Sequence, residues 1–142
     1  MPAGLELDAI VARYSLHHIP DLPRFAVSIA RALRKAGRFL VADPHPLGCD
    51  TTGFVDEYMQ MKSDGQVRLH PLEELRAILG AASLTFVGNS PTTIGFPRPW
   101  NERYGALLER ARPDLVERYR ISREGDCVRI ELPVANALFA KL

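Results

Sequence analysis

The chain has few features that would point to a special environment or an unusual partner. Its two cysteines, Cys49 and Cys127, lack CxxC spacing, so we expect two packed free thiols in a reducing compartment rather than a disulfide framework. The formal net charge is only +1, with basic residues scattered among acidic ones, which gives no global attraction for nucleic acid or anionic lipid. Neither a signal-peptide pattern nor a membrane-length apolar run is visible, which favours a cytoplasmic protein. No glycine-rich GxGxG stretch occurs.

What remains is the composition of one folded α/β domain of 142 residues, with 46% hydrophobic and 25% charged residues. The clearest pattern is near the start. Asp8–Tyr14 and Gly37–Pro44 read as buried strands, apolar on both faces. Between them, Asp21 can cap an amphipathic helix that we expect to stop at Gly37. A strand-helix-strand unit with such short joints is expected to be parallel and right-handed.

The rest of the chain shows weaker but readable signals. We expect short helices over residues 54–62, 100–112 and 113–119, and a clearer amphipathic helix that begins at Pro71. Residues 84–87 read as a strand, and residues 90–99 are a segment rich in proline and glycine, with no strand expected, that leads into the helix near residue 100. The tail reads as two strand segments, 128–132 and 134–140, that are separated by Pro133.

The sequences of Leu7–Asp21 and Ile29–Asp43 resemble the corresponding segments of class I S-adenosylmethionine-dependent methyltransferases, and most closely those of the ubiquinone/menaquinone-biosynthesis type. In that family these segments are the fourth strand, the helix after it and the fifth strand. The sequence differs from the family's pattern at two turns, where Ala36 and Ser83 occupy positions at which the family has glycine. The resemblance implies a partial Rossmann-like methyltransferase sheet, its second half, with two parallel strands, an antiparallel C-terminal hairpin and flanking helices.

The same resemblance implies that something is missing. The family's glycine-rich loop cradles the methionine part of S-adenosylmethionine, and an acidic residue after its second strand binds the ribose hydroxyls. Residues 1–142 would therefore be a single domain, the C-terminal half of the fold, without that cofactor-binding half. The strand Asp8–Tyr14 would be left with an unpaired edge. We expect a homodimer through this edge, or a separate chain that supplies the N-terminal half.

The predicted cofactor site lies at the carboxyl end of the first strand, where open α/β sheets bind ligands. By resemblance, Ala12, Arg13, Leu16 and His17 would approach S-adenosylmethionine. His17 is the candidate catalytic residue, either as a general base or as a polar wall. For its neighbour His18 we expect a packed, hydrogen-bonded histidine that fixes the turn.

Predicted substrate contacts are Asp43, His45 and Tyr58. Asp43 could orient a methyl acceptor, or it could cap the loop that begins at Pro44. Tyr58 could line a cover over the substrate, although packing in the core is the more ordinary role. We expect no metal site, because adjacent histidines seldom bind one ion and no histidine pair has helical ligand spacing.

Two functions follow from this interpretation. The first is an S-adenosylmethionine-dependent methyltransferase that acts on a small molecule, by proximity and orientation, and that binds its cofactor poorly as an isolated chain. The second is a non-enzymatic homodimeric module derived from a methyltransferase. Nothing in the sequence names the methyl acceptor, and neither nucleic acid nor a membrane is an expected partner.

Overall fold

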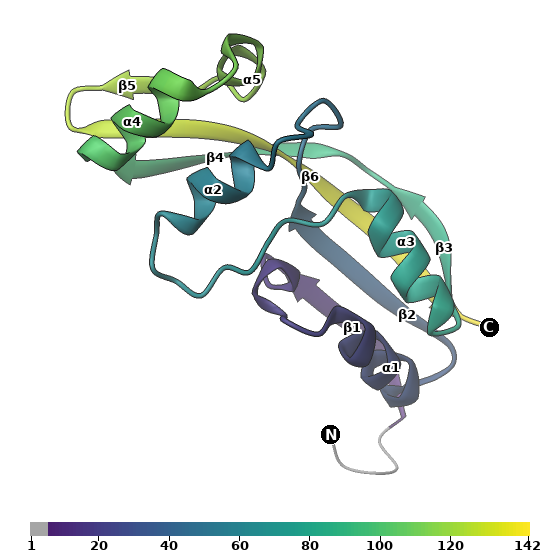
Figure 1. The fold of residues 1–142 in the computed structure, drawn as a ribbon. Coiled ribbons are helices and arrows are strands. Elements are labelled where there is room, and N and C mark those ends of the chain that lie inside the picture. The colour runs from purple at the N-terminus through teal and green to yellow at the C-terminus, as the bar shows by residue number, and fades with distance from the viewer. Residues whose placement is uncertain (1–5) are drawn as a thin grey trace.

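The computed structural model describes residues 6–142, which form one mixed sheet with helices packed on it (Figure 1). The strands are β1 (Leu7–Arg13), β2 (Leu33–Pro44), β3 (Leu84–Asn89), β4 (Thr92–Pro99), β5 (Ser122–Glu124) and β6 (Cys127–Lys141). The main strand order is β1-β2-β6-β3, and β4 and β5 pair with β6. β1 and β2 are parallel, whereas β6 is antiparallel to β2 and β3. The expected parallel pair with antiparallel strands after it is confirmed.

The strand-helix-strand unit forms as predicted at its beginning but not at its end. Asp21 accepts a 3.0 Å hydrogen bond from the backbone N–H of Arg24 and so caps α1 (Leu22–Ala32). The helix stops at Ala32, so the prediction that Gly37 ends it is wrong. Gly37 serves a close approach instead, because a Cβ there would lie 2.8 Å from the carbonyl oxygen of Arg34.

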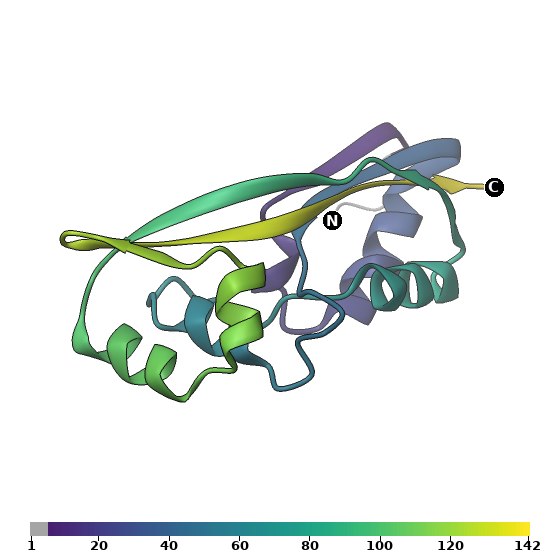
Figure 2. The same ribbon diagram turned by 90° about the horizontal axis from the view of Figure 1, so that it is seen from above.

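The first hydrophobic core lies between this part of the sheet and two helices. α1 and α3 (Leu72–Ala81) lie on the same side of the sheet (Figure 2). They pack their apolar faces on the strand side chains that point toward them. Buried members of this core include Leu22, Ile29, Phe39, Val41, Leu75, Leu79 and Phe139.

A second core lies at the other end of the long strand β6. It is formed by α2 (Phe54–Gln60), α4 (Glu102–Arg110) and α5 (Pro113–Arg118), which lie on the same side of the sheet as α1 and α3 (Figures 1 and 2). Its buried residues include Tyr58, Leu69, Tyr104, Leu107, Leu115, Tyr119 and Ile130. Each group of helices therefore covers one half of the sheet.

Three expectations for the second half are corrected. The proline- and glycine-rich segment over residues 90–99, for which no strand is expected, contains strand β4, and β4 pairs with β6 along its whole length. The two tail segments are one strand, because Pro133 lies just beyond the last β2–β6 pair and its missing N–H costs little there. Cys127 is exposed at the β5–β6 hairpin rather than packed, while Cys49 is half-buried. Within residues 6–142, no helix combines the length and apolarity that crossing a bilayer would need.

Candidate functional site

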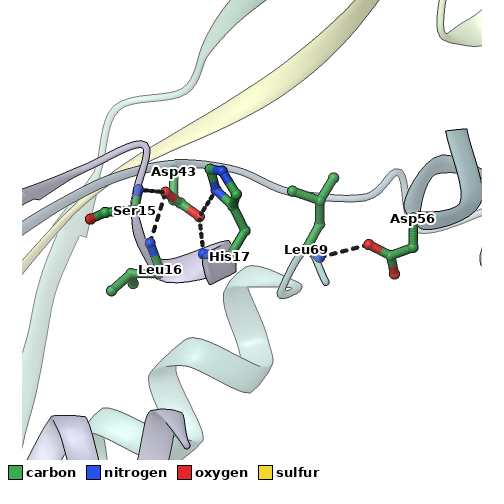
Figure 3. A network of polar contacts seen from close by, with 6 residues as sticks. All are labelled: Ser15, Leu16, His17, Asp43, Asp56 and Leu69. Carbon is green, nitrogen blue, oxygen red and sulfur yellow. Dashed lines mark hydrogen bonds and ion pairs between the residues drawn. The ribbon is translucent and has the colours of Figure 1, made fainter. Parts of the chain in front are cut away.

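The carboxylate of Asp43 organises the turn that follows β1 (Figure 3). One oxygen, Oδ1, accepts from the backbone N–H of Ser15 at 2.8 Å and of Leu16 at 3.3 Å. The other, Oδ2, accepts from the backbone N–H of His17 at 3.2 Å and lies 3.0 Å from Nδ1 of the same residue. Asp43 is 2% exposed; its contacts with Leu16 and His17 are buried, and the one with Ser15 is partly buried.

The register of the two parallel strands makes this arrangement possible. Arg13 is paired with Ala42, and the N–H of Tyr14 donates to the carbonyl of Ala42 at 2.8 Å. Asp43 therefore follows directly beside the point where β1 turns away. Tyr14 adopts a left-handed backbone with φ of +50° and leads into the short turn η1 (Leu16–His18). The N–H groups of Ser15, Leu16 and His17 point at the carboxylate, whereas that of His18 donates to the carbonyl of Ser15.

The contact between Asp43 and His17 decides what the imidazole can do. A carboxylate only accepts hydrogen bonds, so it favours the tautomer in which Nδ1 carries the proton and Nε2 keeps a lone pair. This is the arrangement of an oriented base, with the carboxylate also able to stabilise the imidazolium that forms on protonation. The pair can accept a proton at Nε2 of His17.

The other predicted cofactor residues surround this pair in different ways. Ala12 is buried and Arg13 is exposed, with its guanidinium 4.9 Å from the centre of the Tyr14 ring. Leu16 is 1% exposed and belongs to the first core, so its side chain anchors the turn. His18 is half-buried, and the role of a hydrogen-bonded histidine that fixes the turn, expected for His18, belongs to His17.

The predicted substrate residues do not form one group. Asp43 caps the turn after β1 and not the loop after Pro44, so that alternative is wrong. His45 lies two residues further along the chain, with Nδ1 3.1 Å from the carbonyl oxygen of Pro46. Tyr58 is fully buried in the second core, its ring centre 5.0 Å from that of Tyr104, and its hydroxyl has no hydrogen-bond partner among residues 6–142. Burial raises the pKa of Tyr58 above its usual range.

Sequence reasoning missed the segment that covers the turn. The N–H of Val67 donates to the carbonyl of His17 at 2.8 Å, and the N–H of Leu69 donates to Asp56 at 2.7 Å (Figure 3). Burial raises the pKa of Asp56, although the bond from Leu69 opposes that change. The first bond holds Val67 against the turn, and the second ties Leu69 to α2. Nothing in the local sequence signals them, because both partners are distant along the chain.

His70 follows in the same segment and is also buried. Its Nδ1 lies 3.4 Å from Oε2 of Glu74, and its Nε2 has no hydrogen-bond partner in the described part of the chain. Burial lowers the pKa of His70, and the nearby Arg68 lowers it further, which favours the neutral ring. Across residues 6–142, no group of three histidine, cysteine, aspartate or glutamate side chains is placed to hold a metal ion.

Comparison with known proteins gives matches in sequence and in structure. Residues 3–41 match a family model described as a methyltransferase domain. The chain is also 31% identical, over 80 residues, to the uncharacterized methyltransferase YcgJ of Bacillus subtilis. That match covers 56% of this chain and 32% of YcgJ.

Solved structures extend the similarity to nearly the whole chain. The YcgJ crystal structure superposes with a TM-score of 0.80 at 20% identity, covering 96% of this chain and 64% of YcgJ. The 1,6-didemethyltoxoflavin-N1-methyltransferase of Burkholderia thailandensis, solved with 1,6-didemethyltoxoflavin and S-adenosylhomocysteine, gives 0.50 at 16% identity, with 96% and 46% covered. The chain thus spans less than two thirds of each of these proteins. The matches confirm the Rossmann-like methyltransferase fold and the resemblance to class I S-adenosylmethionine-dependent methyltransferases.

Proposed function

We propose that this chain, a relative of the class I S-adenosylmethionine-dependent methyltransferases, forms one wall of a methyl-transfer site that acts on a small molecule. The observation that carries the proposal is the Asp43–His17 pair. It lies where the parallel strands β1 and β2 end, the edge at which open α/β sheets bind ligands. The turn is held by three backbone hydrogen bonds, so its geometry is set before any ligand arrives.

The residues fit the cofactor in part. Ala12 and Arg13 end the strand beside the turn, and His17 supplies a polar wall that could face the sulfonium. S-adenosylmethionine supplies an electrophilic methyl group for in-line transfer. The chain would position the acceptor and take its proton at Nε2 of His17. Residues 6–142 contain no glycine-rich loop for the methionine part, so we expect weak cofactor binding by this chain alone.

A small acceptor is supported by the Burkholderia relative, which was solved with the small molecule 1,6-didemethyltoxoflavin. Asp43 is already engaged with the turn, so we assign it the positioning of His17 rather than direct contact with the acceptor. His45, two residues after Asp43 along the chain, remains a candidate contact. Both cysteines are free thiols, which supports a location in the cytoplasm.

Titration with S-adenosylhomocysteine, followed by NMR, tests the proposal. We expect saturable shifts at the backbone signals of residues 12–17, with Kd near or below about 1 mM, and no shifts around Tyr58, which is buried in the second core. The variant His17→Gln should keep this binding but lose methyl transfer, whereas His18→Gln should lose neither. A well-folded chain whose signals do not respond would refute the proposal and favour the non-enzymatic module.

The free edge of β1 is the proposed joint to a second polypeptide, for which we favour a second copy of this chain over a separate N-terminal half. In the described part of the chain β1 pairs with β2 alone, which leaves its outer N–H and C=O groups unpaired. The N–H of Tyr14 points to β2, so by alternation that of Val11 points outward. Sedimentation should show a dimer that Val11→Pro dissociates. A monomer that resists changes of concentration would contradict the homodimer.

A further inference from the structure

Arg98 is a half-buried cation beside the second core that has no counter-charge. Among the arginines of residues 6–142 it alone is half-buried, and the others are exposed. Arg98 pairs with the buried Val128 across β4 and β6, so its side chain lies on the side of the sheet that the helices cover. The ion pairs that arginines form within the described residues do not include Arg98. A cation that is withdrawn from water normally has an anionic partner, and Arg98 lacks one.

A second polar group without a partner lies at the same place. The Tyr58 side chain is fully buried, and its hydroxyl forms no hydrogen bond within residues 6–142, although buried phenols usually do. Its ring centre is 5.0 Å from that of Tyr104, which is also buried. Burial raises the pKa of both phenols, and the positive charge of Arg98 opposes the change in both. The unpaired guanidinium and the unpaired hydroxyl are therefore neighbours.

Aromatic rings flank Arg98 along the chain. Phe96 precedes it by two residues on the same side of β4, and the guanidinium carbon lies 5.5 Å from the centre of the Phe96 ring. Trp100 follows by two residues and also packs against the second core. Phe96, Arg98 and Trp100 are all half-buried, so solvent still reaches part of each side chain. A cation–π contact is weaker than a charge pair and uses none of the N–H donors of the guanidinium.

The unpaired groups indicate the chemistry of the missing partner. A guanidinium only donates hydrogen bonds, and a phenol with a raised pKa keeps the proton that it can donate. The partner must therefore offer acceptor oxygens and negative charge. Asp64 is the carboxylate whose charge reaches Tyr104, but it is engaged by Nζ of Lys62 at 3.2 Å. The chain thus supplies the donors without the anion.

We propose that the second core binds a small ring-bearing anion, a carboxylate or a phosphate ester, through Arg98 and Tyr58. The anionic oxygens would accept from the guanidinium and from the Tyr58 hydroxyl, which resolves both unpaired groups at once. The ring of the ligand would lie against Phe96 and Trp100, where flat apolar surface remains accessible.

Titration with benzoate at low salt, followed by NMR of the Arg98 Nε–H and the Trp100 indole N–H, tests the proposal. We expect saturable shifts with Kd of about 1 mM, and about tenfold weaker binding of benzamide, which has the same shape without the charge. Phenyl phosphate is the second probe. Tighter binding of phenyl phosphate than of benzoate would identify the ligand as a phosphate ester, and the reverse order as a carboxylate.

Two variants and one control locate the site. Tyr58→Phe removes a hydroxyl that has no partner in the described part of the chain, so stability should not fall, yet benzoate affinity should fall about threefold. Arg98→Gln should weaken benzoate about tenfold. Arg103→Gln is the matched control, because Arg103 is an exposed arginine of α4 beside Tyr104, and it should change the affinity less than about twofold.

Three results would overturn the proposal. They are equal affinities for benzoate and benzamide, no response from a folded chain, and an unchanged affinity in Tyr58→Phe. Equal losses in Arg98→Gln and Arg103→Gln would also overturn it, because they would show attraction to surface charge alone. The titration needs no cofactor and reports on the second core. Its failure leaves the Asp43–His17 proposal standing, and a chain that ignores S-adenosylhomocysteine can still bind benzoate here.

Discussion

Replacing Asp43 tests whether one carboxylate holds the candidate site. Asp43 accepts three backbone N–H groups and contacts Nδ1 of His17, all within 2.8–3.3 Å. Asp43→Asn keeps the shape but removes the charge. Its Oδ1 can still accept from Ser15 and Leu16, whereas an amide NH2 group would replace the oxygen that faces the N–H of His17. The loss of one backbone bond and of charge assistance should lower the free energy of unfolding by about 2–3 kcal/mol.

Asp43→Ala should cost more, because all the donors around the carboxylate then lose their acceptor. We expect a loss of about 4–5 kcal/mol, which is a large part of a typical total of about 5–15 kcal/mol. Asp21→Asn is the matched control. Asp21 also caps a helical turn, but through one exposed bond, and asparagine is an equally good N-cap, so the change should stay below about 0.5 kcal/mol.

Urea unfolding followed by far-ultraviolet circular dichroism measures these differences. The double variant Asp43→Asn with His17→Gln completes a cycle, and the two changes should be coupled by more than about 0.5 kcal/mol because the side chains are in contact. A loss below about 1 kcal/mol for Asp43→Asn would show that the carboxylate does not hold the turn. Additive effects in the cycle would remove the argument that Asp43 orients His17.

Three further predictions concern stability, each measured by the same unfolding assay. Ser83 has φ of +66°, a region that favours glycine, so Ser83→Gly should stabilise the protein by up to about 1 kcal/mol; a loss would refute strain at this turn. Gly37→Ala should cost about 1–3 kcal/mol, because its Cβ would meet the backbone oxygens of Arg34 and Leu7 at 2.8 and 3.1 Å, and an unchanged stability would contradict that close approach. Burial and Arg68 lower the pKa of His70 below its unfolded value, so its contribution is present at neutral pH and is lost as the pH falls through the unfolded and then the folded pKa. His70→Gln should therefore flatten the fall in unfolding free energy between about pH 7 and pH 5, and an identical slope would show that His70 does not titrate in this way.

The sequence alone determined the first strand-helix-strand unit and its direction. Apolar residues on both faces of residues 8–14 and 37–44, a capping residue at Asp21 and short joints leave little choice but a parallel pair. The sequence of the same segment also carries the resemblance to class I S-adenosylmethionine-dependent methyltransferases. These signals are local, because periodicity, capping and turn residues act within a few positions of each other.

Only the tertiary structure decided how the site is assembled. Asp43 meets the turn at residues 15–17 because two strands end side by side, 26–28 positions apart along the chain. The same holds for the strand at residues 92–99, whose prolines and glycines indicate no strand until pairing with β6 is known. Hydrogen bonds between distant segments depend on register, and register is set by packing of the whole sheet rather than by local preference.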